Sequence, residues 1–199
     1  MKTSAELETR TSRGLEQFCA SLDGRAGLKI LDLAGASQST ISFVTGQGHS
    51  LYSEDFMMQL EECFGEGGFN ENQADPVSAE RFLQGALGFP PDGFDGALVW
   101  DVLENLGSGL LMRVVARLHA ILRPGASLLA LFHAEEQKAP APAFSYRIQD
   151  RRTILMTPRG ARRPVQFFNN RNLERLFQDF QSVKFFLTRD ALREVIVKR

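Results

Sequence analysis

Short apolar runs and amphipathic segments alternate along most of the chain. The runs have the length and the flanking turn residues of buried parallel strands, and strands are predicted at four places: 28–33, 51–55, 96–100 and 127–132. Helical spacing of apolar positions predicts the helices between them: 38–45, 78–85 and 110–122. Strands that alternate with helices form a parallel sheet with helices on both faces. The pattern therefore predicts an α/β fold with a mostly parallel sheet.

The two ends of the chain depart from this alternation. Residues 5–22 are amphipathic with an interruption at Gly14, and we expect residues 1–27 to form a helical lead-in. At the other end, a helix is followed by two strands, 182–187 and 192–198. Only four residues join these strands, so they must pair antiparallel. The mostly parallel sheet is therefore expected to end in an antiparallel hairpin.

Residues 134–166 are different in kind. Two short apolar segments flank a polar turn at 149–152, which predicts a hairpin. Between 144 and 164 there are six arginines and one aspartate, a local net charge of +5. Such a basic patch suits an anionic acceptor, a phosphate or a nucleic acid. The alternative is a solvated hairpin, or one that docks on the acidic 61–75 segment, itself expected to be a long or weakly ordered loop.

Composition limits the possible classes of protein. The 199 residues, 43% hydrophobic and 24% charged, are typical of one globular domain, which we expect to span 1–199. A net charge of −1 argues against a general affinity for nucleic acid. The two cysteines and three histidines have no ligand spacing, so no metal site is expected. Without a signal-like or membrane-spanning apolar run, a cytoplasmic location is expected.

Four segments, taken in order, resemble the class I S-adenosylmethionine (SAM)-dependent methyltransferases, and specifically their type-11 branch. Residues 30–37 are similar to the family's first strand and turn, and Asp55 lies 23 residues after Asp32, where the second strand ends in an acid. Residues 89–106 resemble the fourth strand and its approach, and 122–132 resemble the fifth strand. The resemblance implies a Rossmann-like sheet, SAM as cofactor and methyl transfer as the activity.

This resemblance also places the 134–166 hairpin as an insertion after the fifth strand, where the family builds lids over the acceptor. The cofactor turn departs from the family's glycine-rich pattern, because its three expected glycines are Ala34, Ala36 and Gln38, with Gly35 between them. A residue without Cβ lets backbone approach a ligand closely, and the larger Gln38 is the greatest departure. The resemblance further implies a third strand at 82–84, where the family's adenine-binding acid is replaced by leucine.

The resemblance implies a cofactor site at the carboxyl ends of the strands. Its candidate residues are Asp32, Ala34, Gly35, Ala36, Ser37, Glu54, Asp55, Leu83, Gln84, Trp100 and Asp101. Asp32 would hold the turn or the methionine ammonium, and the helix that opens at Ser37 suits a carboxylate. The 23-residue spacing favours Asp55 over Glu54 for the ribose hydroxyls. Helix capping is the alternative role for these polar residues, and core packing is the alternative for Trp100.

No catalytic residue is assigned, because methyl transfer by in-line displacement needs positioning more than a nucleophile. His133, at the end of the fifth strand, is a candidate general base, with a satisfied surface histidine as the alternative. Two functions stay open. One is SAM-dependent methyl transfer to a small molecule, and the other is an inactive methyltransferase-like binding or assembly module. A dinucleotide oxidoreductase would require G-x-G-x-x-G, which this chain lacks.

Overall fold

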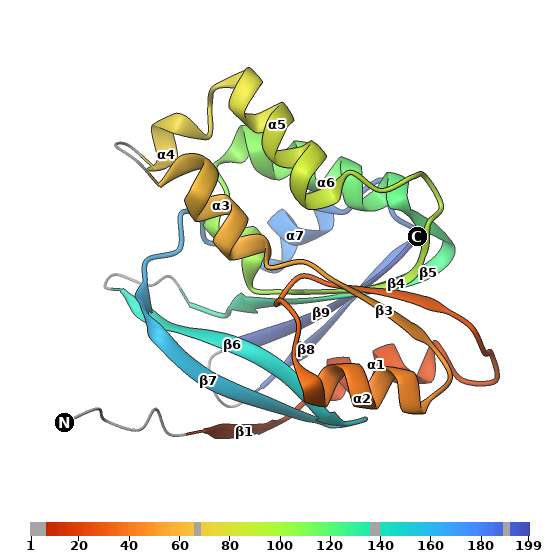
Figure 1. Ribbon diagram of the computed structural model, residues 1–199. Coiled ribbons are helices and arrows are strands. Elements are labelled where there is room, and N and C mark those ends of the chain that lie inside the picture. The colour runs from red at the N-terminus through yellow and green to blue at the C-terminus, as the bar shows by residue number, and fades with distance from the viewer. Residues whose placement is uncertain (1–6, 66–68, 136–139, 189–191) are drawn as a thin grey trace.

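The computed structural model describes residues 7–65, 69–135, 140–188 and 192–199 (Figure 1). In this part of the chain the main sheet has six strands in the order β3-β2-β4-β5-β9-β8. The strands are β2 (Lys29–Asp32), β3 (Ser50–Ser53), β4 (Phe94–Trp100), β5 (Leu122–His133), β8 (Ser182–Leu187) and β9 (Leu192–Lys198). The first four run parallel, and β9 is antiparallel to both β5 and β8. The predicted parallel sheet and its terminal hairpin are confirmed.

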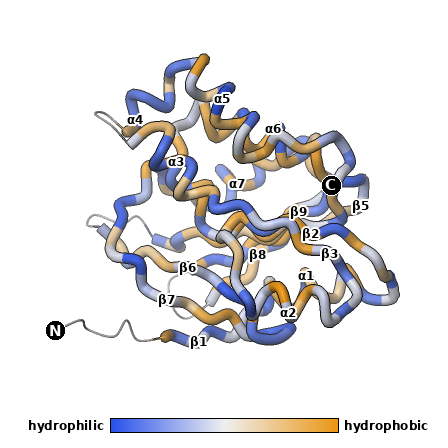
Figure 2. Tube along the Cα trace, in the orientation of Figure 1, coloured by the Kyte–Doolittle hydropathy of each residue, from blue (hydrophilic) through white to orange (hydrophobic). Residues whose placement is uncertain are grey.

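Helices cover both faces of this sheet, as predicted (Figure 1). One face carries α1 (Arg13–Ala20) and α2 (Gln38–Gly46). The other carries α3 (Phe56–Phe64), α4 (Phe69–Asn72), α5 (Pro76–Leu87), α6 (Ser108–Ile121) and α7 (Asn170–Leu176). Figure 2 shows hydrophobic positions gathered in the middle of the molecule, near β2 and β9. No helix in the described residues is long and apolar enough to cross a membrane.

The apolar face predicted for 110–122 is the buried face of α6. Its residues Leu110, Leu111, Val114, Val115, Leu118 and Ile121 are all at most 5% exposed. Full burial of one such side chain contributes about 1.5–3 kcal/mol. This helix therefore anchors the face of the sheet that carries α3, α5 and α7, and fixes the position of β4 and β5 beneath it.

The inserted hairpin is a second, smaller sheet. Strands β6 (Ala141–Asp150) and β7 (Thr153–Arg162) pair antiparallel around a turn at 151–152, which confirms the predicted hairpin. A short strand, β1 (Glu8–Thr11), adds to the outer edge of β7. Apolar side chains of the hairpin join one buried cluster with those of the main sheet and of α1 and α2. The hairpin is therefore packed against the domain, on the side of α2 (Figure 1).

The helical lead-in is only partly correct. Residues 8–11 form β1, because their backbone pairs with β7, with Arg10 opposite Ile154. The helix starts later, at Arg13, where the Ser12 hydroxyl accepts a hydrogen bond from the Leu15 amide at 2.9 Å. Gly14 does not interrupt the helix. A Cβ there would lie 2.9 Å from Leu129 Cδ1, so glycine lets α1 approach the sheet.

The expected third strand at 82–84 is wrong. These residues lie within α5, which begins with Pro76 and is capped by Asp75, whose carboxylate accepts from the Ser78 amide at 2.8 Å. The helix predicted over 78–85 is thus confirmed and is longer. Cap and proline together favour a helix start. In the described residues β3 is the edge of the sheet, and the 61–75 segment contains the end of α3 and the short α4.

Candidate active site

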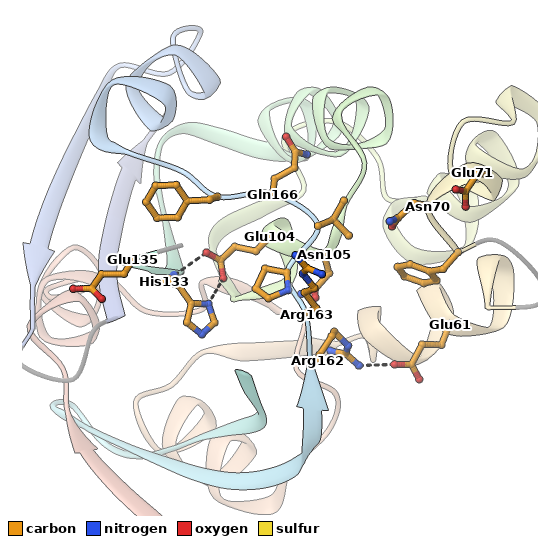
Figure 3. A pocket seen from close by; sticks show the side chains of 14 residues that line it. Glu61, Asn70, Glu71, Glu104, Asn105, His133, Glu135, Arg162, Arg163 and Gln166 are labelled. Atoms are coloured by element: carbon orange, nitrogen blue, oxygen red, sulfur yellow. Dashed lines mark hydrogen bonds and ion pairs between the residues drawn. The ribbon is translucent and has the colours of Figure 1, made fainter. Parts of the chain in front are cut away.

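The carboxyl ends of β2, β3, β4 and β5 meet at one edge of the main sheet, where open α/β sheets bind ligands. Three cavities line up along this edge. Two of them, of about 330 and 360 Å³, lie at the ends of β2, β3 and β4 beneath the hairpin, and together we call them the groove. The third, of about 640 Å³, lies at the ends of β4 and β5, and we call it the open pocket (Figure 3).

The turn after β2 packs against the end of β3. The amide of Gly35 donates to the Glu54 carbonyl at 3.0 Å, and the Gly35 φ of +82° is one that glycine adopts without strain. A Cβ at this position would lie 3.3 Å from Asp55 Oδ2. The one glycine that the turn retains is thus at the position where the chain needs it. Ala34 and Ala36 line the groove beside it.

Helix α2 opens directly after this turn. The Ser37 hydroxyl accepts from the Thr40 amide at 3.3 Å, so Ser37 caps the helix. Gln38 is exposed, and its side-chain amide donates to the Ser42 hydroxyl at 3.1 Å. The large residue in the turn therefore lies along its own helix instead of filling the groove.

Asp55 and Glu54 face different surroundings. Asp55 lies in the wall of the 330 Å³ cavity and caps α3, with Oδ1 accepting from the Met58 amide at 3.0 Å. The Glu54 carboxylate accepts from the side-chain amide of Gln59, Nε2, at 2.9 Å. Glu54 is not among the residues that line the groove. Of the two neighbours, Asp55 is the one placed to meet a ligand.

Asp32 is fully buried at the end of β2. Its Oδ1 accepts from the Ala34 amide at 3.0 Å and from the Trp100 indole Nε1 at 2.7 Å. Its Oδ2 has no hydrogen-bond partner within the described residues. Burial raises the pKa of Asp32 to about 6, despite the two hydrogen bonds that favour the charged form. An unpaired buried carboxylate oxygen is costly and marks a position where a donor or a cation would be stabilised.

Trp100 and Tyr146 form an aromatic pair across the groove. Their ring centroids are 5.2 Å apart and their planes differ by 3°, so the rings are stacked. The Tyr146 hydroxyl donates to Asp101 Oδ2 at 2.9 Å, and burial raises the pKa of Asp101 to about 6. Trp100 has a φ of +56°, a conformation that bulky residues rarely adopt. Sequence reasoning named Trp100 and Asp101 but missed Tyr146, whose position depends on how the hairpin docks.

Strand β6 divides the groove into its two cavities. Both cavities have Ala34, Ser145, Tyr146 and Arg159 in their walls, so these residues stand between them. The 330 Å³ part contains Asp55 and Asp101, and the 360 Å³ part follows the turn and the start of α2, with Arg147 on its far side. Tyr146 is 4% exposed, which shows how tightly the strand covers this edge.

A glutamate–histidine pair lies in the wall of the open pocket (Figure 3). His133 Nδ1 is 2.6 Å from Glu104 Oε2, and the His133 backbone amide donates to Glu104 Oε1 at 2.7 Å. Glu104 is 1% exposed, whereas the His133 ring is partly exposed. The hydrogen bond that Glu104 accepts from the His133 ring raises the pKa of His133, whereas burial lowers it. His133 is thus a partnered histidine whose Nε2 has no partner among the described residues.

Sequence reasoning missed Glu104 as this partner. It lies in the 3-10 turn Val102–Asn105 that follows β4 and is the one charged residue in the buried run from 102 to 106. An acid among buried apolar neighbours is itself a signal that a specific partner is present. The Glu104 carbonyl also accepts from the Val165 and Gln166 amides, at 2.8 and 3.2 Å. Glu104 therefore fixes both His133 and the 165–166 wall of the pocket.

The groove and the open pocket adjoin. Glu61 and Arg162, which form an ion pair, line both the 330 Å³ cavity and the open pocket. A small cavity of about 10 Å³ between them is lined by Asp101 from one side and by Glu104 and His133 from the other. The shared wall means that two ligands, one in each space, would approach each other beside Asp101 and His133.

Leu83 and Gln84 lie outside this arrangement. Leu83 lies on the buried side of α5, in the helical core. Gln84 lies on the exposed side of the same helix, where its side-chain amide donates to the Glu80 carboxylate at 2.9 Å. Neither is among the residues that line the groove or the open pocket. Within the described ranges, no group of three metal-ligating side chains is present.

No family model and no curated protein matches the sequence. Among solved structures, the chain is similar to the 1,6-didemethyltoxoflavin N1-methyltransferase of Burkholderia thailandensis, determined with 1,6-didemethyltoxoflavin and S-adenosylhomocysteine. The identity is 14% over 94% of this chain and 76% of that chain, with a TM-score of 0.51.

SAM-dependent methyltransferases of two archaea are similar to the same degree. For that of Methanosarcina mazei the identity is 14%, over 96% of this chain and 98% of the other, with a TM-score of 0.51. For that of Archaeoglobus fulgidus the identity is 12%, over 93% of this chain and 91% of the other, with a TM-score of 0.51. The chain has the fold of the class I SAM-dependent methyltransferases. At these identities the likeness shows the fold alone, and the type-11 branch stays a prediction.

Proposed function

We propose that the protein transfers a methyl group from SAM to a small-molecule acceptor. The observation that carries this proposal is that the groove and the open pocket adjoin at the carboxyl edge of the sheet. The groove is lined by the acids and the turn that this fold uses for a cofactor, and the open pocket by a histidine held by a buried glutamate. The similar Burkholderia enzyme was solved with 1,6-didemethyltoxoflavin, which supports a small-molecule acceptor.

Polar residues that line the groove, together with the buried Asp32 beside Trp100, fit SAM. Asp32 Oδ2 is a buried carboxylate oxygen without a partner, as expected for an atom that meets the methionine ammonium. Asp55 lies in the wall with room to accept from ribose hydroxyls, and the amides at the start of α2 suit the methionine carboxylate. When bound there, SAM supplies a methyl group already activated by its sulfonium.

The open pocket would hold the acceptor. His133 Nε2 is placed to take the proton from an acceptor hydroxyl or amine, while Nδ1–H donates to Glu104. Glu104 keeps the ring oriented, since its other oxygen is held by the His133 backbone amide. Arg163, an exposed residue in the same wall, would pair with a negative group on the acceptor (Figure 3).

Calorimetric titration with S-adenosylhomocysteine tests this proposal. We expect micromolar binding that weakens at least tenfold in Asp55→Asn, because the variant loses the charged acceptor for the ribose hydroxyls. Glu54→Gln is the matched control: its carboxylate bonds Gln59 and does not line the groove, so its affinity should stay within about twofold of the wild type. Equal weakening in both variants, or no binding at all, would contradict the proposal.

An inactive module is expected to have a side chain that fills the adenosyl cavity. The sequence offers Gln38, at the position of the turn's third glycine, and Phe82, in the segment expected to be the third strand. Gln38 lines the 360 Å³ cavity but is exposed and bonded along α2, and Phe82 is buried with Phe56 and Phe64 in the helical core. Neither blocks the groove, and we therefore do not favour this alternative.

A further inference from the structure

Tyr146 occupies the part of the groove where its two cavities would otherwise join. The residue comes from the inserted strand β6, stacks face to face on Trp100 at 5.2 Å and donates to Asp101 at 2.9 Å. It lies in the walls of both cavities. A ligand that extends from Asp55 to the start of α2 would have to pass through the position of this ring.

The aromatic pair also holds two acids at the ends of β2 and β4: the half-buried Asp101, which lines the groove, and the fully buried Asp32, which does not. The Trp100 indole donates to Asp32 and the Tyr146 hydroxyl donates to Asp101. In this arrangement protein side chains provide hydrogen bonds that a cationic ligand group would provide instead. Asp32 keeps one oxygen unpaired even so, which leaves the closed arrangement incompletely satisfied.

Tyr146 lies in the regular part of the hairpin. The β6–β7 ladder is continuous from Phe144 to Ile148, with Tyr146 opposite Met156, and its irregularities lie outside this stretch. Ile148 is also tied to α2, because its amide donates to the Thr40 hydroxyl at 3.0 Å. The backbone of the strand is thus held in place, and displacement of the Tyr146 ring requires a change of its side-chain rotamer and no change of strand pairing.

We propose that Tyr146 closes the cofactor groove and is displaced by the amino-acid end of SAM or S-adenosylhomocysteine. This inference rests on the proposed function. The ligand's ammonium replaces the tyrosine hydroxyl as the partner of Asp101 and meets the free oxygen of Asp32. Its carboxylate lies at the start of α2, in the cavity lined by Arg147 and Arg159.

Trp100 is the sole tryptophan of the chain, so its fluorescence reports directly on the stack. We expect S-adenosylhomocysteine to change Trp100 emission as Tyr146 leaves. Tyr146→Phe keeps the ring but loses the bond to Asp101, which weakens the closed state and should tighten binding about tenfold. Tyr146→Ala should tighten it further and should raise the quenching of Trp100 by acrylamide in the free protein. Tyr52→Phe, at the exposed edge strand β3, is the control and should change neither.

The outcomes separate this inference from the proposed function. Binding of S-adenosylhomocysteine with unchanged Trp100 emission, and with equal affinity in the wild type and Tyr146→Phe, would overturn the closure and leave the function standing. Binding to the wild type with a change in Trp100 emission, and tighter binding to Tyr146→Phe, would support the closure. Absence of binding to the wild type and to both Tyr146 variants would overturn closure and function together.

Discussion

The groove and the open pocket lie side by side at one edge of the same sheet, yet they are built in opposite ways. At the groove, Asp101 in the wall and the buried Asp32 next to Trp100 are engaged by the protein's own aromatic side chains, and a strand divides the space. In the open pocket, a buried acid orients a histidine that still has one free nitrogen among the described residues, and the space is continuous. On our proposal the groove rearranges when a ligand binds, whereas the open pocket is already formed.

The difference has a physical origin in what covers each site. The hairpin β6–β7 lies over the groove, so its apolar inner face buries Asp32 and Trp100 completely. Among the described residues, the open pocket is lined by the segment 162–167, which Glu104 holds through its carbonyl, and no strand crosses it. Burial raises the energy of a charged carboxylate, whereas a partly exposed histidine keeps access to solvent and substrate.

Removal of the histidine should have the largest effect. In His133→Gln we expect kcat for methyl transfer to fall by about 100- to 10,000-fold, because the acceptor loses its proton acceptor. S-adenosylhomocysteine affinity should be unchanged. His119→Gln, on α6 against Phe180, is the matched control and should retain activity. A variant at His133 with full activity would show that the open pocket is not the reaction site.

Removal of the buried charge of Asp32 should have the next largest effect, and this effect is on stability. Wild-type Asp32 ionises at pH 3.8 when unfolded and at about 6 when folded, so its ionisation lowers the free energy of unfolding as pH rises between these values. Asp32→Asn removes this penalty and should raise the free energy of unfolding at about pH 8 by up to about 3 kcal/mol. The gain should vanish below about pH 4. Denaturant unfolding at both pH values measures it, and a constant difference would contradict the account.

The same variant should lose affinity for S-adenosylhomocysteine, since the neutral amide cannot pair with an ammonium. A gain in stability with a loss of binding is the pattern expected of a residue kept for function. Stability and affinity that fall together would instead indicate that Asp32 only supports the turn.

A smaller effect is expected from Glu104→Gln, on the pH dependence of the reaction. Glu104 raises the pKa of His133, and the base form of the histidine is the one above that pKa. Activity should therefore fall as pH drops through the raised pKa, and in Glu104→Gln this fall should move to lower pH. An acid limb that stays in place would show that another group controls it.

The smallest effect is expected from Arg163→Gln at the exposed rim of the open pocket. An ion pair at an exposed position contributes about 0.2–1 kcal/mol, so KM for an anionic acceptor should rise about two- to fivefold with kcat unchanged. For a neutral acceptor KM should not change. A large change in kcat would mean that Arg163 acts on the reacting atoms.

The succession of strands and helices along the chain could largely be predicted from the sequence, because buried strands and one-sided helices leave strong local patterns. The strand expected at 82–84 was wrong because it rested on the family's arrangement. Asp75 and Pro76, by contrast, favour the helix that the structure has there. Strand β1 was missed for another reason. Its four residues have no strand pattern of their own and depend on pairing with β7, about 145 residues later.

Some residues of the candidate site could likewise be predicted from the sequence, and others could not. Asp55 was favoured over Glu54 from spacing alone, and it is the one that lines the groove. The partner of His133 and the position of Tyr146 were beyond reach, because each depends on contacts between distant segments, 29 and 45 residues apart. Local pattern therefore located the edge of the sheet at which we propose that ligands bind, and tertiary packing determined which side chains face each other there.

The most direct test of the whole account is a crystal structure of the protein with S-adenosylhomocysteine. We expect the ligand to lie along the groove, with its ribose hydroxyls at Asp55, its ammonium at Asp32 and Asp101, and the Tyr146 ring withdrawn from Trp100. Its sulfur should then point toward His133 across the wall beside Asp101. A ligand lodged only in the open pocket, with the Trp100–Tyr146 stack intact, would contradict the assignment of the two cavities.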